Sequence, residues 1–180
     1  AREELARGLD GLLGERPGTG GILIAGTPRS SATIARLRLP LAGLGEEGYL
    51  IRSVRLGRRP ATIIAANRDL GVLYGAFAFL RRLQTGQPID ALDLRDAPKL
   101  RLRILNHWDN LDRSVERGYA GASIWDWHRL PGWSDPRYAD YARANASIGI
   151  NGAVLTNVNA NAEVLTPLYL KKVAALADVF

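Results

Sequence analysis

The sequence predicts an α/β protein in two parts, residues 1–98 and residues 99–180. Helical and strand patterns follow one another as α-β-α-β-β-α in the first part, which predicts a small sheet covered by helices, an α/β sandwich-like domain. They follow one another as β-α-β-α in the second part, the repeat of a parallel sheet with right-handed crossovers. Asp96, Ala97 and Pro98 mark the boundary between the parts. We expect a non-catalytic domain first and the first two β/α units of a barrel second.

The elements of the first part follow from hydrophobic spacing and from the residues that interrupt it. Leu5, Leu9 and Leu12 recur at helical spacing, and Gly14 follows the last of them. The run GILIAG at residues 21–26 is apolar and bounded by glycines, which suits a buried strand. The other expected elements are a helical piece that ends near Leu37, a strand over 47–56, its hairpin partner over 61–66, and a helix over 69–83.

The second part has one unusually long connection. The expected elements are a strand over 100–108, a connection over 109–135, a helix over 136–148, a strand over 152–156, and a helix capped by Thr166. A parallel sheet must be covered on both faces and a β/α barrel has eight repeats, so two units leave a barrel incomplete. The chain also lacks methionine and starts within a helical pattern, so we expect a fragment of a longer protein.

Composition and charge exclude several classes of function. The net charge is +6, but residues 1–103 carry +7 and residues 104–180 carry −1, so the positive charge lies away from the aromatic residues. A single-stranded nucleic acid needs both in one groove, and we expect no nucleic-acid partner. No segment approaches the ~18 apolar residues of a membrane span. Gly71 and Gly75 lie inside a helix, where they allow close packing against a sheet, and no phosphate-binding loop occurs, so we expect no cofactor.

The candidate site lies between residues 106 and 158, which hold all four tryptophans and both histidines. In parallel β/α folds, functional residues follow the carboxyl ends of the strands. Trp108 and Asp109 lie at that end of the first expected strand, and Asn157 and Val158 lie at that end of the second. The 27-residue connection after the first strand greatly exceeds the ~2–6 residues typical of such loops, and long loops tend to be functional. We therefore expect these four residues to line a substrate site.

The other polar residues of this stretch favour structural roles. Strand alternation places His107 on the face opposite Trp108, so we expect a packed, hydrogen-bonded histidine and no catalytic base. Asp109, Asp112, Glu116 and Asp126 alternate with arginines, which favours ion pairs and caps within the loop. No helical histidine pair, HExxH or GxSxG motif occurs, so we expect no metal site and no serine nucleophile.

Several motifs identify a family. NHWDNLDRSVERGYAG, SIWDWH, DYARANASIGING, TNVNAN and LTPLYLKKVAALADVF, in this order and spacing, closely resemble the α-glucuronidases of glycoside hydrolase family 67. LGEEGYLIRS and LGVLYGAFAFLRRLQTG resemble the N-terminal domain of that family. The resemblance implies an N-terminal domain similar to that of hexosaminidases, a catalytic β/α barrel and a possible homodimer. It implies hydrolysis, with inversion, of the α-1,2 linkage between (4-O-methyl)-D-glucuronic acid and the terminal xylose of xylo-oligosaccharides.

The resemblance also assigns roles to two residues. Trp108 matches the tryptophan that packs on the uronic acid ring, and Val158 matches an apolar contact to the 4-O-methyl group. The family's catalytic carboxylates and its basic uronate-binding residues come later than this chain extends, so we expect no catalytic residue here and no activity from these residues alone. The alternative function is a non-catalytic carbohydrate-binding module that presents Trp125, Trp127 and Trp133 as a platform for sugar.

Overall fold

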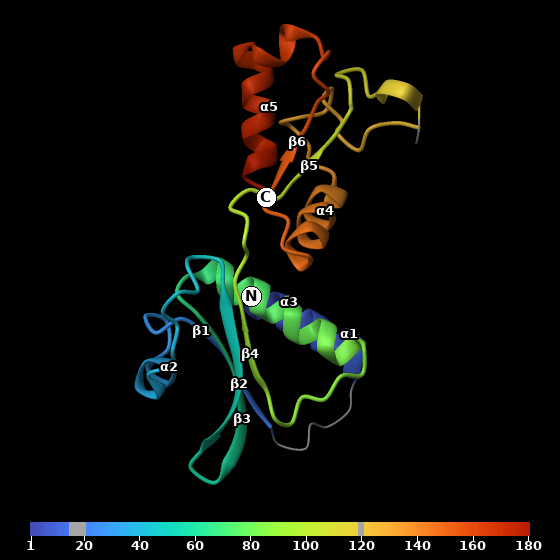
Figure 1. The fold of residues 1–180 in the computed structure, drawn as a ribbon. Helices are drawn as coiled ribbons and strands as arrows, with labels where there is room; N and C mark the ends of the chain where they lie inside the picture. The colour runs from blue at the N-terminus through green and yellow to red at the C-terminus, as the bar shows by residue number, and fades with distance from the viewer. Residues whose placement is uncertain (15–20, 119–120) are drawn as a thin grey trace. The chain divides into compact units, whose positions relative to one another are not determined.

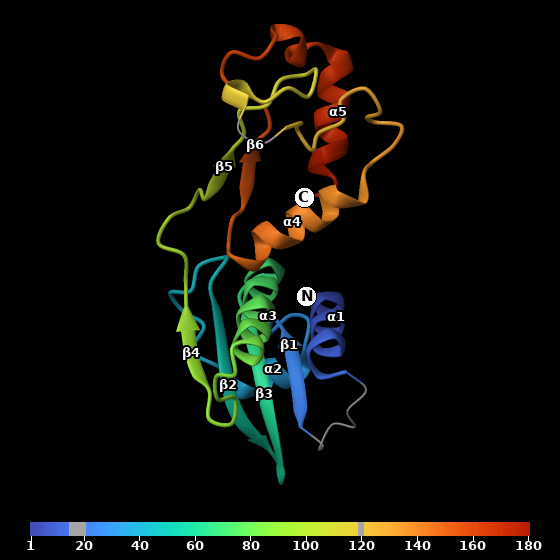
Figure 2. The same ribbon diagram turned by 90° about the vertical axis from the view of Figure 1, so that its right-hand side faces the viewer.

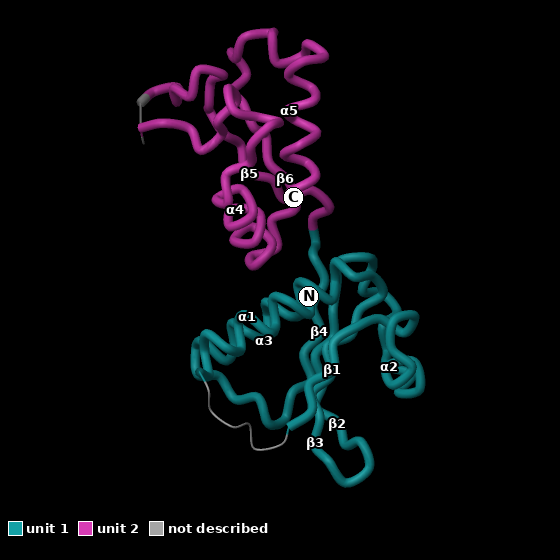
Figure 3. The backbone as a smooth tube through the Cα atoms, turned by 180° about the vertical axis from the view of Figure 1, so that it is seen from behind, with its two compact units in different colours: residues 1–99 teal, residues 100–180 magenta. Residues whose placement is uncertain are grey.

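The structure of the chain, a computed structural model, describes residues 1–14, 21–118 and 121–180. These residues form two compact units, Ala1–Lys99 (unit 1) and Leu100–Phe180 (unit 2), as Figure 3 shows. Both units combine helices with strands, so the chain has the mixed α/β fold that the sequence predicts. Within the described ranges, no helix is long and apolar enough to cross a membrane.

Unit 1 contains the elements expected for residues 1–98, with one strand more. They are α1 (Arg2–Leu13), β1 (Ile22–Gly26), α2 (Ala32–Leu37), β2 (Tyr49–Leu56), β3 (Arg59–Ala66), α3 (Asp69–Gln84) and β4 (Asp93–Asp96). The strands form one sheet in the order β1-β3-β2-β4. β1 runs parallel to β3, whereas β2 runs antiparallel to both of its neighbours (Figure 1).

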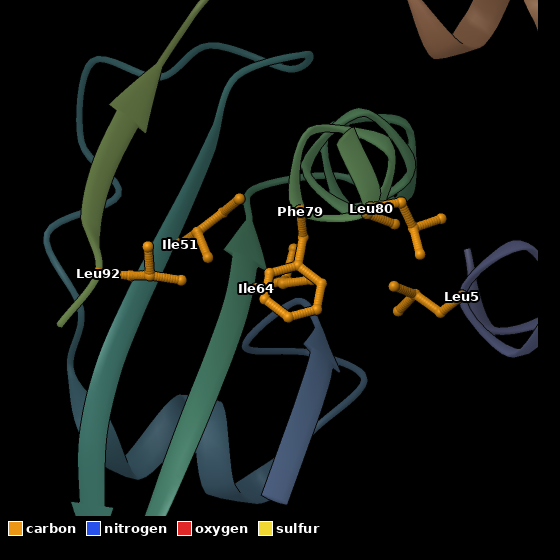
Figure 4. Packing of buried hydrophobic residues seen from close by; sticks show 7 residues of the cluster. Leu5, Ile51, Ile64, Phe79, Leu80 and Leu92 are labelled. Carbon is orange, nitrogen blue, oxygen red and sulfur yellow. The ribbon is translucent and has the colours of Figure 1, made fainter. Parts of the chain in front are cut away.

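The alternation of side chains along β3 separates two hydrophobic cores. Ile64 faces α1 and α3, where it packs in one buried cluster with Leu5 and Phe79 (Figure 4). Ile63 belongs to a second buried cluster with Ile34 of α2. Because successive strand residues point to opposite faces, both faces of the sheet are covered and the sheet is the middle layer of unit 1. Figure 2 shows α1 and α3 side by side on one of these faces.

The two glycines of α3 let this helix approach the sheet closely. A Cβ atom on Gly75 would lie 2.7 Å from Cγ2 of Ile64, and one on Gly71 would lie 2.5 Å from the carbonyl oxygen of Gly48. Both distances are shorter than normal atomic contacts, so a larger residue at either position would push the helix away. The prediction that these glycines serve close packing is confirmed.

The strand β4 was not predicted, because its sequence DLRD has the polar character of a loop. It forms the edge of the sheet, where two polar side-chain contacts add to its backbone pairing with β2. Arg52 of β2 pairs with Asp93 at 2.7 Å, and the hydroxyl of Tyr49 donates a hydrogen bond to Asp96. Burial and the neighbouring Asp96 carboxylate raise the pKa of Tyr49 to about 12, so the phenol keeps its proton and remains a donor at neutral pH.

Unit 2 contains two short parallel strands and two longer helices. Its elements are β5 (Ile104–Asn106), η1 (Glu116–Gly118), α4 (Pro136–Ser147), β6 (Gly152–Val154), η2 (Ala162–Leu165) and α5 (Pro167–Ala177). β5 pairs with β6 in parallel register, and the order β5-α4-β6-α5 is the one predicted. Thr166 precedes α5 as expected, but its hydroxyl donates to the carbonyl of Glu163 and does not cap the helix.

The two strands are shorter than predicted, and at the amino-terminal end of β5 side chains take over the pairing. The backbone N–H of Arg103 donates to the side-chain oxygen of Asn151, and the Asn151 amide donates in turn to the carbonyl of Arg101. These bonds hold residues 101–103 beside the start of β6 without extending the ladder. Apolar periodicity alone cannot distinguish such a segment from a strand.

Candidate functional site

The parallel pairing of β5 and β6 brings the segments that follow them to the same edge of unit 2 (Figure 2). Asn106 is paired with Val154 at the last position of the ladder. The N–H of His107 donates to the carbonyl of Val154 at 3.0 Å, and farther along the N–H of Asn157 donates to the carbonyl of Asp109 at 3.0 Å. The two segments therefore stay in contact beyond the ladder.

Asp109 and Asn157, two of the predicted site residues, form the buried frame of this edge. Only 5% of Asp109 and 6% of Asn157 is exposed. The side-chain amide of Asn157 donates to the side-chain oxygen of Asn110, and its own oxygen accepts the backbone N–H of Asn159 at 2.5 Å. Buried polar groups arranged in this way hold the backbone of both segments in one conformation.

Trp108 and Val158, the other two predicted site residues, are exposed. The exposed fraction is 40% for Trp108 and 93% for Val158. Exposed large apolar side chains on a hydrogen-bonded frame are typical of a binding surface. Each strand end therefore carries one buried polar residue next to one exposed apolar residue. These are Asp109 with Trp108 after β5, and Asn157 with Val158 after β6.

The loop after β5 folds back onto both strand ends. The N–H of Glu116 donates to the carbonyl of Trp108 at 2.8 Å, and Asp109 forms an isolated bridge with Val115. The carboxylate of Glu116 accepts a hydrogen bond from the side chain of Asn159 at 3.4 Å. Residues 115 and 116 therefore join the segment that carries Trp108 to the segment that carries Val158.

His107 is packed, as predicted. Its ring lies edge-on to Trp125 with centroids 5.4 Å apart, and Nε2 lies 2.6 Å from the hydroxyl of Tyr141. Burial raises the pKa of Tyr141, so this hydroxyl keeps its proton at neutral pH. Nδ1 of His107 lies 3.8 Å from the Asp109 carboxylate. His107 thus supports the frame residue Asp109.

Two of the four loop carboxylates, Asp112 and Asp126, bond within the loop as predicted, whereas Glu116 bonds to Asn159 of the segment after β6. Asp112 accepts hydrogen bonds from the hydroxyl and the N–H of Ser114, and these bonds hold the pKa of Asp112 below its usual value. Asp126 pairs with Arg113 at 3.4 Å. Among the residues that the structure describes, no group of three His, Cys, Asp or Glu side chains could hold a metal ion.

The alternative sugar platform of three tryptophans is wrong for two of them. Trp125 and Trp127 are 0% exposed and form the centre of the hydrophobic core of unit 2. Trp125 packs against Tyr138 and Tyr141 of α4, and Trp127 packs against Tyr169 of α5. The helices that follow the loop therefore bury these indoles.

Trp133 is the partly exposed member of this group, at 37%. The guanidinium carbon of Arg129 lies 3.6 Å from the centre of its ring. Trp133 alone does not make the predicted platform, because the other two tryptophans are buried.

Sequence reasoning assigned Arg117 to ion pairs within the loop and missed its contact with Trp108. Its guanidinium carbon lies 4.8 Å from the centre of the Trp108 ring. The available signal was the position of Arg117 in the motif ERGYAG, shortly after Trp108 in the same loop. Residues 119 and 120 of that motif lie outside the described residues.

Comparison with known proteins shows that both parts of the chain match domains of the same glycosyl hydrolase family. Residues 1–79 match the family described as Glycosyl hydrolase family 67 N-terminus, and residues 82–180 match the family described as Glycosyl hydrolase family 67 middle domain.

Curated relatives carry related names. The chain is 32% identical over 187 residues to Probable alpha-glucuronidase A of Aspergillus fumigatus, an alignment that covers 100% of this chain and 22% of that protein. It is 40% identical over 126 residues to Alpha-glucuronidase A of Emericella nidulans, which covers 67% of this chain and 15% of that protein. The chain therefore spans about a fifth of the length of these relatives.

A solved structure shares the fold. It is a family GH115 4-O-methyl-alpha-glucuronidase with specificity for decorated arabinogalactans, with a TM-score of 0.53 and 15% sequence identity. The match covers 84% of this chain and 22% of that one. At this identity the likeness supports the α/β fold alone.

Proposed function

Because the chain belongs to glycoside hydrolase family 67, we propose that it is part of an inverting α-glucuronidase. The full-length enzyme hydrolyses the α-1,2 linkage between (4-O-methyl)-D-glucuronic acid and the terminal xylose of xylo-oligosaccharides. In this proposal unit 1 is a hexosaminidase-like, non-catalytic domain, and unit 2 supplies the first two β/α units of the catalytic barrel. A homodimer of the full-length enzyme stays a prediction.

One observation carries the proposal: Trp108 is exposed at the carboxyl end of β5, on a frame that also carries the exposed Val158. An indole offers a large, rigid apolar face on which a pyranose ring can pack. Binding sites of this kind combine such a face with a few fixed polar groups. The edge formed by β5 and β6 has this composition.

In this proposal two of the four predicted site residues contact the sugar, and the other two hold the backbone of the site. Trp108 contacts the uronic acid ring and Val158 contacts the 4-O-methyl group, since both side chains are exposed. Asp109 and Asn157 act through the backbone, because they are buried and connect the two segments by the bond from Asn157 to Asp109. The parallel pairing of β5 and β6 places all four residues at the same edge of the sheet.

Inverting hydrolysis needs an acid that protonates the leaving oxygen and a base that activates water, with ~6.5–9.5 Å between the two carboxyl groups. We assign both to later parts of the full-length enzyme. Asp112 and Asp126 are engaged within the loop, by Ser114 and Arg113, and are poor candidates for either role. We expect the 180 residues alone to release no uronic acid.

The reaction itself tests the proposal. When the full-length enzyme acts on 4-O-methylglucuronosyl-xylotriose, proton NMR should show the β-anomer of the free uronic acid first, because inversion of an α-linkage gives that anomer. The α-anomer follows only as the sugar mutarotates. First appearance of the α-anomer would contradict inversion, and absence of any release would contradict the assigned activity.

Val158→Asn in the full-length enzyme should lower kcat/KM about 3–10-fold for the 4-O-methylated substrate and much less for the unmethylated one. The substitution removes an apolar contact to one methyl group, which is worth about 1 kcal/mol. The fold should tolerate it, because 93% of Val158 is exposed. Steady-state kinetics on the two substrates give the comparison. Val158→Leu keeps an apolar side chain and is the matched control, with its methyl preference retained. Equal losses on both substrates would remove Val158 from this role.

A further inference from the structure

The carboxyl ends of β1 and β3 meet beside a pocket of unit 1. The two strands are neighbours and run parallel, and their last paired residues are Gly26 and Ala65. A pocket of about 350 Å³ lies just after these ends, and its volume suits a small molecule. It is lined by three residues that follow β1 and three that follow β3, namely Thr27, Arg29, Ser30, Asn67, Arg68 and Asp69.

The chain leaves these two strand ends toward opposite faces of the sheet. β1 leads into α2, whose Ile34 packs with Ile63 on one face. β3 leads into α3, whose Phe79 packs with Ile64 on the other face (Figure 1). In open α/β sheets, ligands bind in the crevice where neighbouring parallel strands send their connections to opposite faces. The pocket lies at such a point, so the topology of unit 1 indicates a ligand site there.

Hydrogen bonds hold both walls of the pocket. The N–H of Thr27 donates to Oγ of Ser30 at 2.8 Å, and the N–H of Ser30 donates to Oγ1 of Thr27 at 3.1 Å. On the other wall, the side-chain amide of Asn67 donates to the carbonyls of Leu41 and Gly45, at 3.1 Å and 2.9 Å. The walls are therefore fixed without a ligand, as in most small-molecule sites.

The charged side chains of the pocket carry both signs. Arg29 is exposed and has no hydrogen bond or ion pair with the residues that the structure describes. Arg68 pairs with Glu46 at 3.6 Å, but both side chains are largely exposed, and an exposed pair contributes so little that a ligand can replace it. Asp69, the first residue of α3, adds a carboxylate. The pocket therefore offers guanidinium donors next to a carboxylate acceptor.

We propose that this pocket binds a small sugar that carries one anionic group, a carboxylate or a phosphate. Arg29 and Arg68 bind the anionic group, because guanidinium donors match the oxygens of both. An ionised carboxylate only accepts hydrogen bonds, so Asp69 binds hydroxyl groups of the sugar and repels a second anion. No glycine-rich phosphate motif follows β1, so side chains hold the ligand. The inference does not rest on the proposed function, because all the lining residues belong to unit 1.

The experiment measures the binding of D-glucose 6-phosphate, D-gluconate and D-glucose to the full-length protein by isothermal titration calorimetry. Low ionic strength keeps the screening of the exposed arginines small. We expect at least one of the two anionic sugars to bind, and we expect no binding of D-glucose at the same concentrations. The tighter of the two anionic sugars decides between a phosphate and a carboxylate.

Two variants test the assigned contacts. Arg29→Gln should raise the Kd of the bound anionic sugar about 10-fold or more, since hydrogen bonds between charged groups are among the stronger kinds. Asp69→Asn should lower the preference for this sugar over the same anionic group without a sugar, inorganic phosphate or acetate. The reason is that it removes both an acceptor for hydroxyl groups and a charge that repels anions. A merely structural effect on α3 would weaken both ligands equally.

Arg36→Gln is the matched control, because Arg36 is an exposed arginine of α2 that does not line the pocket. It removes the same charge and should keep the wild-type Kd. The inference would be overturned if neither anionic sugar bound, if D-glucose bound equally well, or if Arg29→Gln left the Kd unchanged. None of these results would bear on the proposed function, which is tested separately by the release of uronic acid.

Discussion

Trp108→Ala in the full-length enzyme is expected to lower kcat/KM for glucuronoxylo-oligosaccharides by about two orders of magnitude. In the proposed function, the substitution removes the indole face on which the uronic acid ring packs, and it leaves the Arg117 guanidinium without its stacking partner. The loss corresponds to about 3 kcal/mol of transition-state stabilisation, the range found for aromatic anchors in binding sites. Steady-state kinetics on one purified oligosaccharide measure it.

Two further variants make this result specific to the site. Trp133→Ala should leave kcat/KM nearly unchanged, because Trp133 is exposed to a similar degree, 37% against 40%, but does not follow either strand. Trp108→Phe keeps an aromatic face and should lose less activity than Trp108→Ala. Unchanged kinetics in Trp108→Ala would remove Trp108 from the substrate site, and equal losses in Trp133→Ala would point to a general loss of structure.

The fold of unit 1 could be predicted from the sequence because its signals are local. The apolar run at 21–26 and the leucine spacing of the first helix each specify one element, and the structure contains both as β1 and α1. β4 could not be predicted, because DLRD becomes a strand only through its partners. It pairs with β2 and is held by Arg52 and Tyr49. The four residues of β4 do not reveal these contacts, because the partner residues lie far away in the sequence.

The candidate site of unit 2 could be predicted in position and less well in detail. The order of the elements places residues 108–109 and 157–158 at one edge, because parallel strands bring their carboxyl ends together. The burial of Asp109 could not be predicted, since it depends on backbone bonds beyond the ladder. The stacking of Arg117 depends on a left-handed turn that no residue type in ERG requires.

The tryptophans of the long loop show why residue type alone does not define a site. Trp125 and Trp133 stand in the same loop, yet the first is completely buried and the second is partly exposed. The difference comes from α4, whose Tyr138 and Tyr141 cover Trp125. An indole is as suited to a core as to a sugar, and the elements that pack against it decide between the two.

Trp125→Ala is expected to lower the free energy of unfolding of unit 2 by about 3–5 kcal/mol, the range for truncation of a buried aromatic residue. Trp125 makes ring contacts with His107, Tyr138, Tyr141 and Phe180, so its removal leaves a cavity that joins several elements. All four tryptophans of the chain lie in this unit, so tryptophan fluorescence during denaturant unfolding reports on unit 2 alone.

The matched control is again Trp133→Ala, which should change the free energy of unfolding by no more than about 1 kcal/mol, because its side chain is partly exposed outside the core cluster. Trp125→Phe should cost less than Trp125→Ala, since it keeps part of the ring contacts. Because Trp125 packs on His107, which faces Asp109, the same cavity should loosen the frame beneath Trp108. An unfolding midpoint that Trp125→Ala leaves unchanged would show that this indole does not hold the unit together, and that the frame of the site is stabilised from elsewhere.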